Sequence, residues 1–445
     1  MWGADQLLSL GDPALRIEGT AGVEVVVTRT HSALTRFAGS RIHQNTSRDD
    51  GEARVRVVLS SGQVAVTATS TLTPAAVRLA AESARAAAAL MPADPGFAGL
   101  APGGATYREA AGPDAETATC TPAHRAQLVA EAIGQLPEGV HGAGTVETSL
   151  LERAVTSTTG TAVHGATTRA AATVLATGAD SSSWASADGT ALALLDLAAL
   201  GRRAAGKVRL GAAPRDLPPG RYPVVLEPGA TVVLAQWLAW LAFAGRAYNE
   251  GRSAVSGRLG EQVCSPLVTL VDDALSPLLP ALPFDAEGTP TGRTALIEAG
   301  RAVGVVHDRA TGQAAGSHST GHALPAPNPT GGLPGSLLMS AGDHSLDDLV
   351  AGVERGLYVT RFHYANVVHP VTPSITGMTR DGTFLVEDGQ IVGGVRDLRF
   401  TESILAALSG VEAVGREVEV ASDLFYGAAC APALRLSGFT FSSAY

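Results

Sequence analysis

The sequence predicts an α+β fold: an N-terminal α/β domain of strands and crossing helices, followed by a mainly β C-terminal domain with one buried helix. Residues 22–72 are rich in Val and Thr, with partial alternation of apolar and polar residues, which indicates strands. An Ala-rich helical segment follows them directly. A second strand-rich region surrounds the most apolar run of the chain, residues 230–245. The 445 residues are enough for two or three domains.

The first domain is predicted to cover residues 1–92. Four segments within residues 22–72 are expected to be strands, separated by turns at Arg48–Glu52 (RDDGE) and Ser60–Gly62 (SSG). The helix after them should end before Pro92.

Two predicted helices begin with the same dipeptide, Thr-Pro. Thr73 precedes Pro74, and Thr121 precedes Pro122, so that a capping hydroxyl stands before a proline at the first helical position. We therefore expect helices to begin at these two sites.

A central α/β region is predicted over residues 93–218. It should open with a Pro/Gly/Ala-rich loop, continue with two strands over residues 144–177, and end with a helix over residues 188–208. The proline-rich stretch 213–230 marks the boundary to the C-terminal domain, residues 219–445.

The C-terminal domain contains a Gly/Pro/Ser-rich segment, residues 288–345, which we expect to be a long loop. A helix should follow, then a hairpin that turns at Glu387–Gln390, a last helix over residues 402–411, and two terminal strands.

The apolar run is too short for a membrane span. It covers 17 residues from Gly229 to Gly245 and includes Gln236, whereas a spanning helix needs about 20 apolar residues. A helix buried on most sides inside a large domain fits better, so no membrane association is expected.

Charge and cysteine content restrict the class of protein. The formal net charge is −10 and there is no dense Lys/Arg run, which argues against binding to nucleic acid. Cys120, Cys264 and Cys430 are far apart, so a disulfide framework is not expected and a reducing, cytoplasmic location is. The first residues lack the basic segment and apolar core of a signal peptide.

Candidate metal ligands are few. The zinc motif HExxH is absent, and the nearest substitute is the pair His318 and His322, four residues apart. Gly316, Gly321 and following prolines indicate a loop there, and no Glu lies between the two histidines. The simpler interpretation is two polar residues on an exposed loop.

Other candidates are weaker still. Ser319 lacks the G-x-S-x-G context, and neither GxGxxG nor a P-loop is present. Cys430 has no activating cation nearby, and the pair Asp272-Asp273 is typical of a solvated cap. The residues alone therefore assign no catalytic residue and no metal ligand.

Several stretches together resemble the TldD/PmbA family, also called TldD/TldE. They are LTRFAGSRIHQN, RYPVVLEPGA, GRSAVSGRLGEQV, LVTLVDD, GLYVTRFHYANVVHPVTPSITGMTRDGTFLVEDGQIVGGV and CAPALRLSGFTFSS. Their order and spacing cover nearly the whole chain.

The resemblance implies a degenerate metal site. TldD-type members are zinc metallopeptidases with a HExxxH helix, and that helix corresponds here to VVLAQWLAW. The two His positions are occupied by Ala235 and Trp240, and the Glu position by Gln236. Ala and Trp offer no lone pair suited to zinc, and an amide cannot act as general base.

The resemblance therefore implies a TldE/PmbA-like, non-catalytic subunit of a heterodimeric zinc metallopeptidase that degrades or processes short unfolded peptides. No cofactor is expected in this chain, and zinc is expected in a TldD-type partner. Because the family is proteolytic while this chain lacks the ligands and the base, its own enzymatic status stays open. The alternatives are an active metallopeptidase with an atypical site, such as His318/His322, and a homodimeric peptide-binding protein without proteolytic activity.

Overall fold

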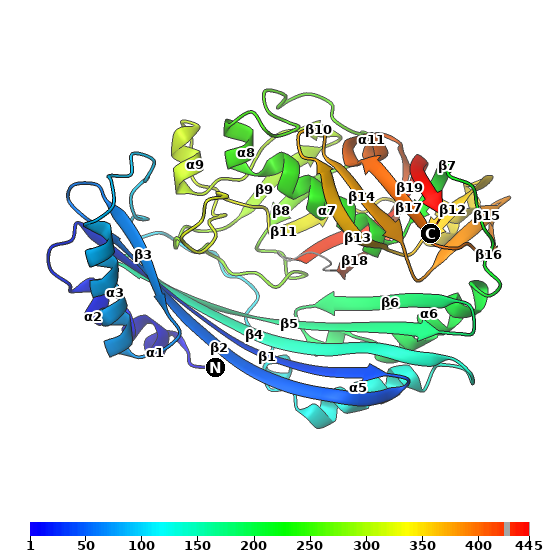
Figure 1. Cartoon of the computed structure of the whole chain (residues 1–445), viewed down its shortest axis with the longest axis horizontal. Helices are drawn as coiled ribbons and strands as arrows, with labels where there is room; N and C mark the ends of the chain where they lie inside the picture. The colour runs from blue at the N-terminus through cyan, green and yellow to red at the C-terminus, as the bar shows by residue number, and fades with distance from the viewer. Residues whose placement is uncertain (422–427, 445) are drawn as a thin grey trace.

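Six strands within residues 22–189 form one antiparallel sheet, the lower layer in Figure 1. The structure, a computed structural model, describes residues 1–421 and 428–444. The strands lie in the order β3-β2-β1-β4-β5-β6. Their bounds are β1 (Gly22–Ala38), β2 (Arg41–Val58), β3 (Val64–Thr69), β4 (His141–Ser157), β5 (Ala162–Thr177) and β6 (Ser182–Gly189). Strands from the predicted segments 1–92 and 93–218 thus share this sheet.

The prediction of a turn at Arg48–Glu52 is wrong. These residues lie within β2, where Gly51 pairs with Arg29 of β1. The chain reverses instead at Gly39 and Ser40, which both have positive φ. Pairing along the whole length of β1 outweighs the local turn preference of Asp and Gly, and the charged side chains remain in solvent. The turn at Ser60–Gly62 is confirmed between β2 and β3.

Both helix starts that follow Thr-Pro are confirmed. The Thr73 side chain accepts a hydrogen bond from the Ala76 backbone N–H at 3.3 Å, and the Thr121 side chain accepts one from His124 at 3.2 Å. The helices of this half are α1 (Ala4–Ser9), α2 (Asp12–Leu15), α3 (Pro74–Ala88), α4 (Ala115–Ala118), α5 (Pro122–Ile133) and α6 (Leu197–Leu210). In Figure 1, α1–α3 and α5 lie on the face of the sheet that points away from the C-terminal half.

The helix predicted over residues 188–208 begins later than expected, at Leu197. The preceding residues 182–189 form β6, which the sequence did not reveal and which pairs with β5 at the sheet edge. Its Ser, Ala and Asp residues have no strong strand preference, so pairing with β5 decides the conformation. Asp196 caps the helix by accepting a hydrogen bond from the Ala199 N–H at 2.7 Å.

The C-terminal half is mainly β, as predicted. The described residues form a 13-stranded sheet with the main order β10-β9-β8-β11-β19-β7-β12-β15-β16. Its strands are β7 (Gly220–Leu226), β8 (Leu270–Asp273), β9 (Arg293–Glu298), β10 (Arg301–Ala302), β11 (Ser336–Met339), β12 (Arg355–Val359), β13 (Phe362–His369), β14 (Ser374–Thr379), β15 (Thr383–Glu387), β16 (Gln390–Gly394), β17 (Leu398–Ser403), β18 (Val411–Ala421) and β19 (Ala428–Ala444). Its helices are α7 (Pro228–Phe243), α8 (Gly245–Asn249), α9 (Arg309–Ala314), α10 (Leu346–Ala351) and α11 (Ile404–Ser409).

Local predictions for this half are mostly confirmed. The hairpin of β15 and β16 turns at Asp388-Gly389, both with positive φ, and α11 precedes two terminal strands. The prediction of a long loop over residues 288–345 is wrong in part, because this segment contains β9, β10, α9 and β11.

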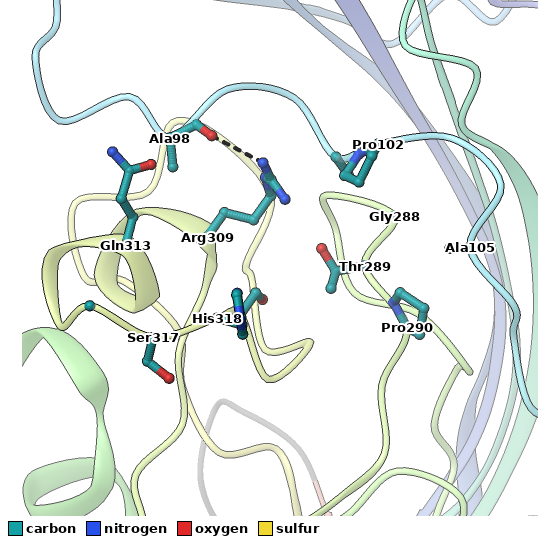
Figure 2. Close-up of a pocket in the computed structure, with 13 residues that line it drawn as sticks. Ala98, Pro102, Ala105, Gly288, Thr289, Pro290, Arg309, Gln313, Ser317 and His318 are labelled. Carbon is teal, nitrogen blue, oxygen red and sulfur yellow. Dashed lines mark hydrogen bonds between the residues drawn. The ribbon is translucent and has the colours of Figure 1, made fainter.

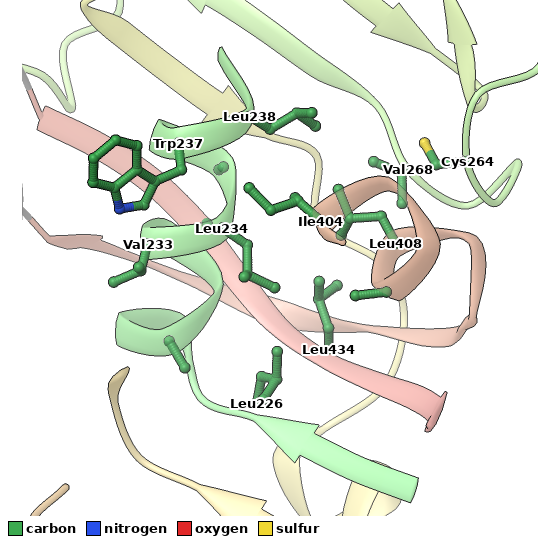
Figure 3. Packing of buried hydrophobic residues seen from close by; sticks show 14 of the residues in the cluster. Leu226, Val233, Leu234, Trp237, Leu238, Cys264, Val268, Ile404, Leu408 and Leu434 are labelled. Atoms are coloured by element: carbon green, nitrogen blue, oxygen red, sulfur yellow. The ribbon is translucent and has the colours of Figure 1, made fainter. Parts of the chain in front are cut away.

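The apolar run forms α7, which the rest of the C-terminal half surrounds. Leu234 and Leu238 point into a cluster with Leu226, Ile404 and Leu434, as Figure 3 shows. Apolar residues occur on every face of α7 because strands and helices pack around the whole helix. Among the described residues, no helix is both long enough and apolar enough to cross a membrane.

We predict that Leu234→Ala lowers the free energy of unfolding by about 2–5 kcal/mol, because it leaves a cavity in this core. Urea denaturation would measure the change. Leu79→Ala on the exposed face of α3 is the matched control and should stay within about 0.5 kcal/mol. A similar small loss for both variants would contradict the central role of α7 in packing.

Candidate functional site

The helix α7 places the three degenerate motif positions in an apolar setting. Ala235 and Gln236 are 1% and 5% exposed. Trp240 is partly buried and stacks on Trp237, with ring centroids 5.3 Å apart. No imidazole or carboxylate projects from these positions. Within residues 1–421 and 428–444, no group of three or more His, Cys, Asp or Glu side chains is arranged to hold a metal ion.

The start of α7 carries the most densely paired carboxylate of the C-terminal half. Glu227, at the N-cap, is 1% exposed and forms ion pairs with Lys207 and Arg203 of α6, the latter at 2.6 Å. Tyr358 and Thr360 donate hydroxyl hydrogen bonds to the same carboxylate. The network joins a helix of the N-terminal half to the central helix of the C-terminal half.

Electrostatics favour the ionised form of Glu227. Burial alone would raise the pKa of this carboxyl, but Lys207 and Arg203 outweigh that effect and lower the pKa to about 2. The positive end of the α7 dipole adds to the stabilisation. Sequence reasoning missed this residue, although Lys207 is the only lysine of the chain and Glu227 directly precedes the helix-starting Pro228.

A small groove lies between the six-stranded sheet and the start of α7. Its volume is about 80 Å³, and residues of β5 and β6 face Gly229 and Arg361 across it. Arg169 and Asp188 form a two-point ion pair on the sheet wall, with Nε–Oδ1 at 3.0 Å. The Arg361 guanidinium lies over the Trp184 ring, 4.0 Å from its centroid. The groove therefore combines fixed charges and an aromatic ring with the half-buried hydroxyls of Thr173 and Ser186 of the sheet.

The structure separates His318 from His322. His318 is exposed and borders a cavity of about 480 Å³ between residues 98–105 and α9, shown in Figure 2. His322 is buried, with Nε2 3.0 Å from Asp272 Oδ1 and Nδ1 2.9 Å from Thr320 Oγ1. Both ring nitrogens of His322 are thus occupied within the protein.

Asp272 is not the solvated cap that its sequence context suggested. It is 1% exposed and accepts hydrogen bonds from the backbone N–H groups of Gly335 and Ser336, besides its contact with His322. Burial would raise the pKa of Asp272, but His322 and these donors lower it below its usual range. Because β8 runs beside β11, only the tertiary fold brings the carboxylate to these donors.

Arg309 fixes the upper wall of the cavity in Figure 2. Its side chain donates hydrogen bonds to the carbonyl oxygens of Ala98 and Gly99, at 3.0 and 3.2 Å. Residues from both halves of the molecule line this cavity.

The cysteines are free thiols, and Cys264 and Cys430 are buried. Burial raises the pKa of Cys264 to about 12 and that of Cys430 to about 11, so both stay protonated and unreactive.

Two family models match the chain. Residues 219–443 match the PmbA/TldA metallopeptidase C-terminal domain, and residues 23–88 match PmbA/TldA metallopeptidase domain 1. Over 227 residues the chain is 29% identical to a metalloprotease of Methanothermobacter thermautotrophicus, covering 50% of this chain and 49% of that protein. It is 29% identical over 211 residues to the metalloprotease TldD homolog of Haemophilus influenzae, covering 46% and 42%. The chain thus spans about half the length of the curated relatives it matches.

Solved structures with the same fold cover almost the whole chain. TldE from Thermococcus kodakarensis superposes with a TM-score of 0.86 at 21% identity, over 99% of both chains. A putative modulator of a DNA gyrase from Thermotoga maritima gives 0.83 at 21% identity, over 98% of this chain and 99% of that one. These likenesses confirm the predicted α+β fold.

We predict that Glu227→Gln destabilises the protein by about 3–5 kcal/mol at neutral pH, because Lys207 and Arg203 lose their buried counter-charge. The carboxylate contributes stability above its ordinary pKa of 4.5, and that contribution is lost as the pH falls toward about 2. Calorimetric melting between pH 3 and 7 should show a steeper acid loss for the native chain than for the variant. The control Glu82→Gln, on the exposed face of α3, should follow the native curve; equal acid slopes for all three proteins would contradict the prediction.

Proposed function

Because the chain belongs to the TldD/PmbA metallopeptidase family, we propose that it is a TldE-like, non-catalytic subunit that pairs with a zinc-bearing TldD-type subunit to process short unfolded peptides. One observation carries the proposal. Every position of the HExxxH motif on α7 holds a residue that neither ligates zinc nor accepts a proton, namely Ala235, Gln236 and Trp240.

The packing around α7 supports the proposal that this chain is non-catalytic. Ala235 is enclosed by the core and Trp240 stacks on Trp237, so apolar contacts occupy the helix where an enzyme needs a polar, open metal position. A restored metal site would have to replace that packing.

The groove beside Gly229 supports a role in holding peptides. It brings the Arg169–Asp188 pair, the Arg361–Trp184 pair and hydroxyl groups to one surface between the two halves. Extended peptides bind through backbone groups at sheet surfaces and edges, with side-chain pockets adding selectivity. Such binding requires no catalytic residue from this chain.

The zinc expected for the family would be held by the partner. His322 has both ring nitrogens engaged and His318 is exposed at a separate cavity, so neither favours an independent zinc site. The alternatives, an atypical metallopeptidase and a homodimeric peptide binder, make different predictions in the same assay.

We predict that the purified chain binds no stoichiometric zinc and does not cleave a mixed unfolded peptide substrate, whereas mixing it with a TldD-type protein yields cleavage. Elemental analysis and mass spectrometry of the products would measure both. A matched TldD-type variant that lacks its motif Glu is the control and should abolish cleavage by the mixture. Stoichiometric zinc with activity that His318→Ala removes would favour the atypical enzyme instead. A self-associated chain that binds peptide and never stimulates a TldD-type protein would favour the homodimeric binder.

We also predict that the double change Ala235→His with Trp240→His does not produce a peptidase. Gln236 would still lack a carboxylate to act as general base, and a further ligand would be missing. Peptide cleavage by this double variant would show that α7 lies closer to a functional site than proposed. Trp240→Phe, which keeps an aromatic ring, controls for effects on packing.

A further inference from the structure

The six-stranded sheet and the C-terminal half meet at the loop of residues 282–290. Leu282 and Phe284 of this loop pack on Val26 of β1 and on Val155 and Val163 of the neighbouring strands. The Tyr107 hydroxyl donates a hydrogen bond to the Gly288 carbonyl at 2.8 Å. The contact is therefore apolar, with a polar edge.

Two carboxylates from opposite sides of this contact share one guanidinium. Arg56 Nη1 of β2 lies 3.4 Å from Glu24 Oε1 of β1 and 3.5 Å from Glu287 Oε1 of the loop. Both distances exceed those of a strong charged hydrogen bond. Glu24 is 2% exposed, and among the described residues its second oxygen has no hydrogen-bond partner.

Other charged groups surround the contact. The packed elements contribute carboxylates and guanidinium groups, namely Glu24 (β1), Arg56 (β2), Arg153 (β4), Asp285 and Glu287 (loop), Asp308 (before α9) and Arg309 (α9). Four carboxyl groups thus face three guanidinium groups and the His322 imidazole, whose pKa is raised by Asp272 and Asp285 despite its burial. Arg309 is also tied to the carbonyl oxygens of residues 98–99. Around Glu24 itself, the cations are Arg56 and Arg309, and the other acids are Glu287 and Asp285.

Asp285 accepts more backbone hydrogen bonds than the other two interface acids, since Glu287 accepts one, from the Arg309 N–H at 3.2 Å. Asp285 accepts its bonds from the backbone N–H groups of Glu287, Thr289 and Ala323, so its ionised form organises the loop itself. Among the described residues, Glu24 accepts no backbone hydrogen bond, and Arg56, which it shares with Glu287, is its nearest cation.

The protonation of these groups responds near neutral pH. Burial, reinforced by Glu287 and Asp285, raises the pKa of Glu24 to about 7 despite Arg56. Burial and Glu287 likewise raise the pKa of Asp285 to about 7, and burial raises that of Glu287.

We propose that the Glu24–Arg56–Glu287 contact is a pH-sensitive latch that holds the loop 282–290 against the sheet when a proton is shared between the carboxyl groups, and loosens it when both ionise. Two cavities lie near this contact. One is bordered by Gly288 and Arg309, and the other, of about 490 Å³, by Arg56 and Glu287. The inference is independent of the role in peptide processing.

The direction of the pH effect follows from the linkage between proton binding and closure of the contact. A carboxyl group whose pKa is raised in the folded state favours the closed contact at low pH, and this advantage is lost as the pH rises from about 4.5 through about 7. The latch is thus closed in mildly acidic solution and open in mildly alkaline solution.

Hydrogen exchange of the full chain tests the latch. We expect the exchange of backbone amides in residues 282–292, divided by their intrinsic rate at each pH, to increase at least about tenfold from pH 6 to pH 8.5. Glu24→Gln and Glu287→Gln each mimic the protonated carboxyl and should flatten this increase. Glu82→Gln, on α3 away from the contact, should leave it unchanged.

Two results would overturn the latch. One is a native chain with equal normalised exchange at both pH values. The other is a native-like increase that persists in both interface variants. The pair of variants keeps the test decisive if one of them fails to fold.

Discussion

The buried carboxylate of Glu227 is the interaction on which the arrangement of the two halves depends. It sits where α7 begins, and its counter-charges come from α6 of the N-terminal half. A carboxylate so deeply buried is tolerated only when cations and hydroxyl donors surround it, which fixes the spacing between the two helices. The position of α7 relative to α6, and with it the groove beside Gly229, follows from this anchor.

The same helix carries residues that do not suit a zinc site at the three motif positions of the family. Catalytic zinc sites need an open coordination position and ordered polar ligands, and both conflict with close apolar packing. On α7, Ala235 and the stacked pair Trp237 and Trp240 give apolar contacts instead. Under the function proposed above, this chain offers a peptide surface and shape from both halves rather than a reacting group.

Two buried acids at the junction of the halves behave in opposite ways for one physical reason. Glu227 meets two cations and two hydroxyl groups and stays ionised. Glu24 shares a single guanidinium with Glu287 and tends to keep its proton. The ion pairs of Glu227 therefore persist over the neutral pH range. The contact near residues 282–290 is the one that we propose to change with pH.

The sequence by itself determined the local features: the helices after Thr73 and Thr121, the hairpin at Asp388-Gly389, the non-spanning apolar helix, and the absence of zinc ligands at positions 235, 236 and 240. Helix caps, turns and side-chain chemistry depend on a few neighbouring residues, so they can be predicted from the amino-acid sequence. Tertiary structure alone decided that Arg48–Glu52 extends β2, that residues 182–189 form a strand, and that Glu227, Asp272 and Glu24 are buried with their particular partners. Those outcomes depend on long-range strand pairing and on charges up to about 260 residues apart, such as Glu24 and Glu287, which no local pattern encodes.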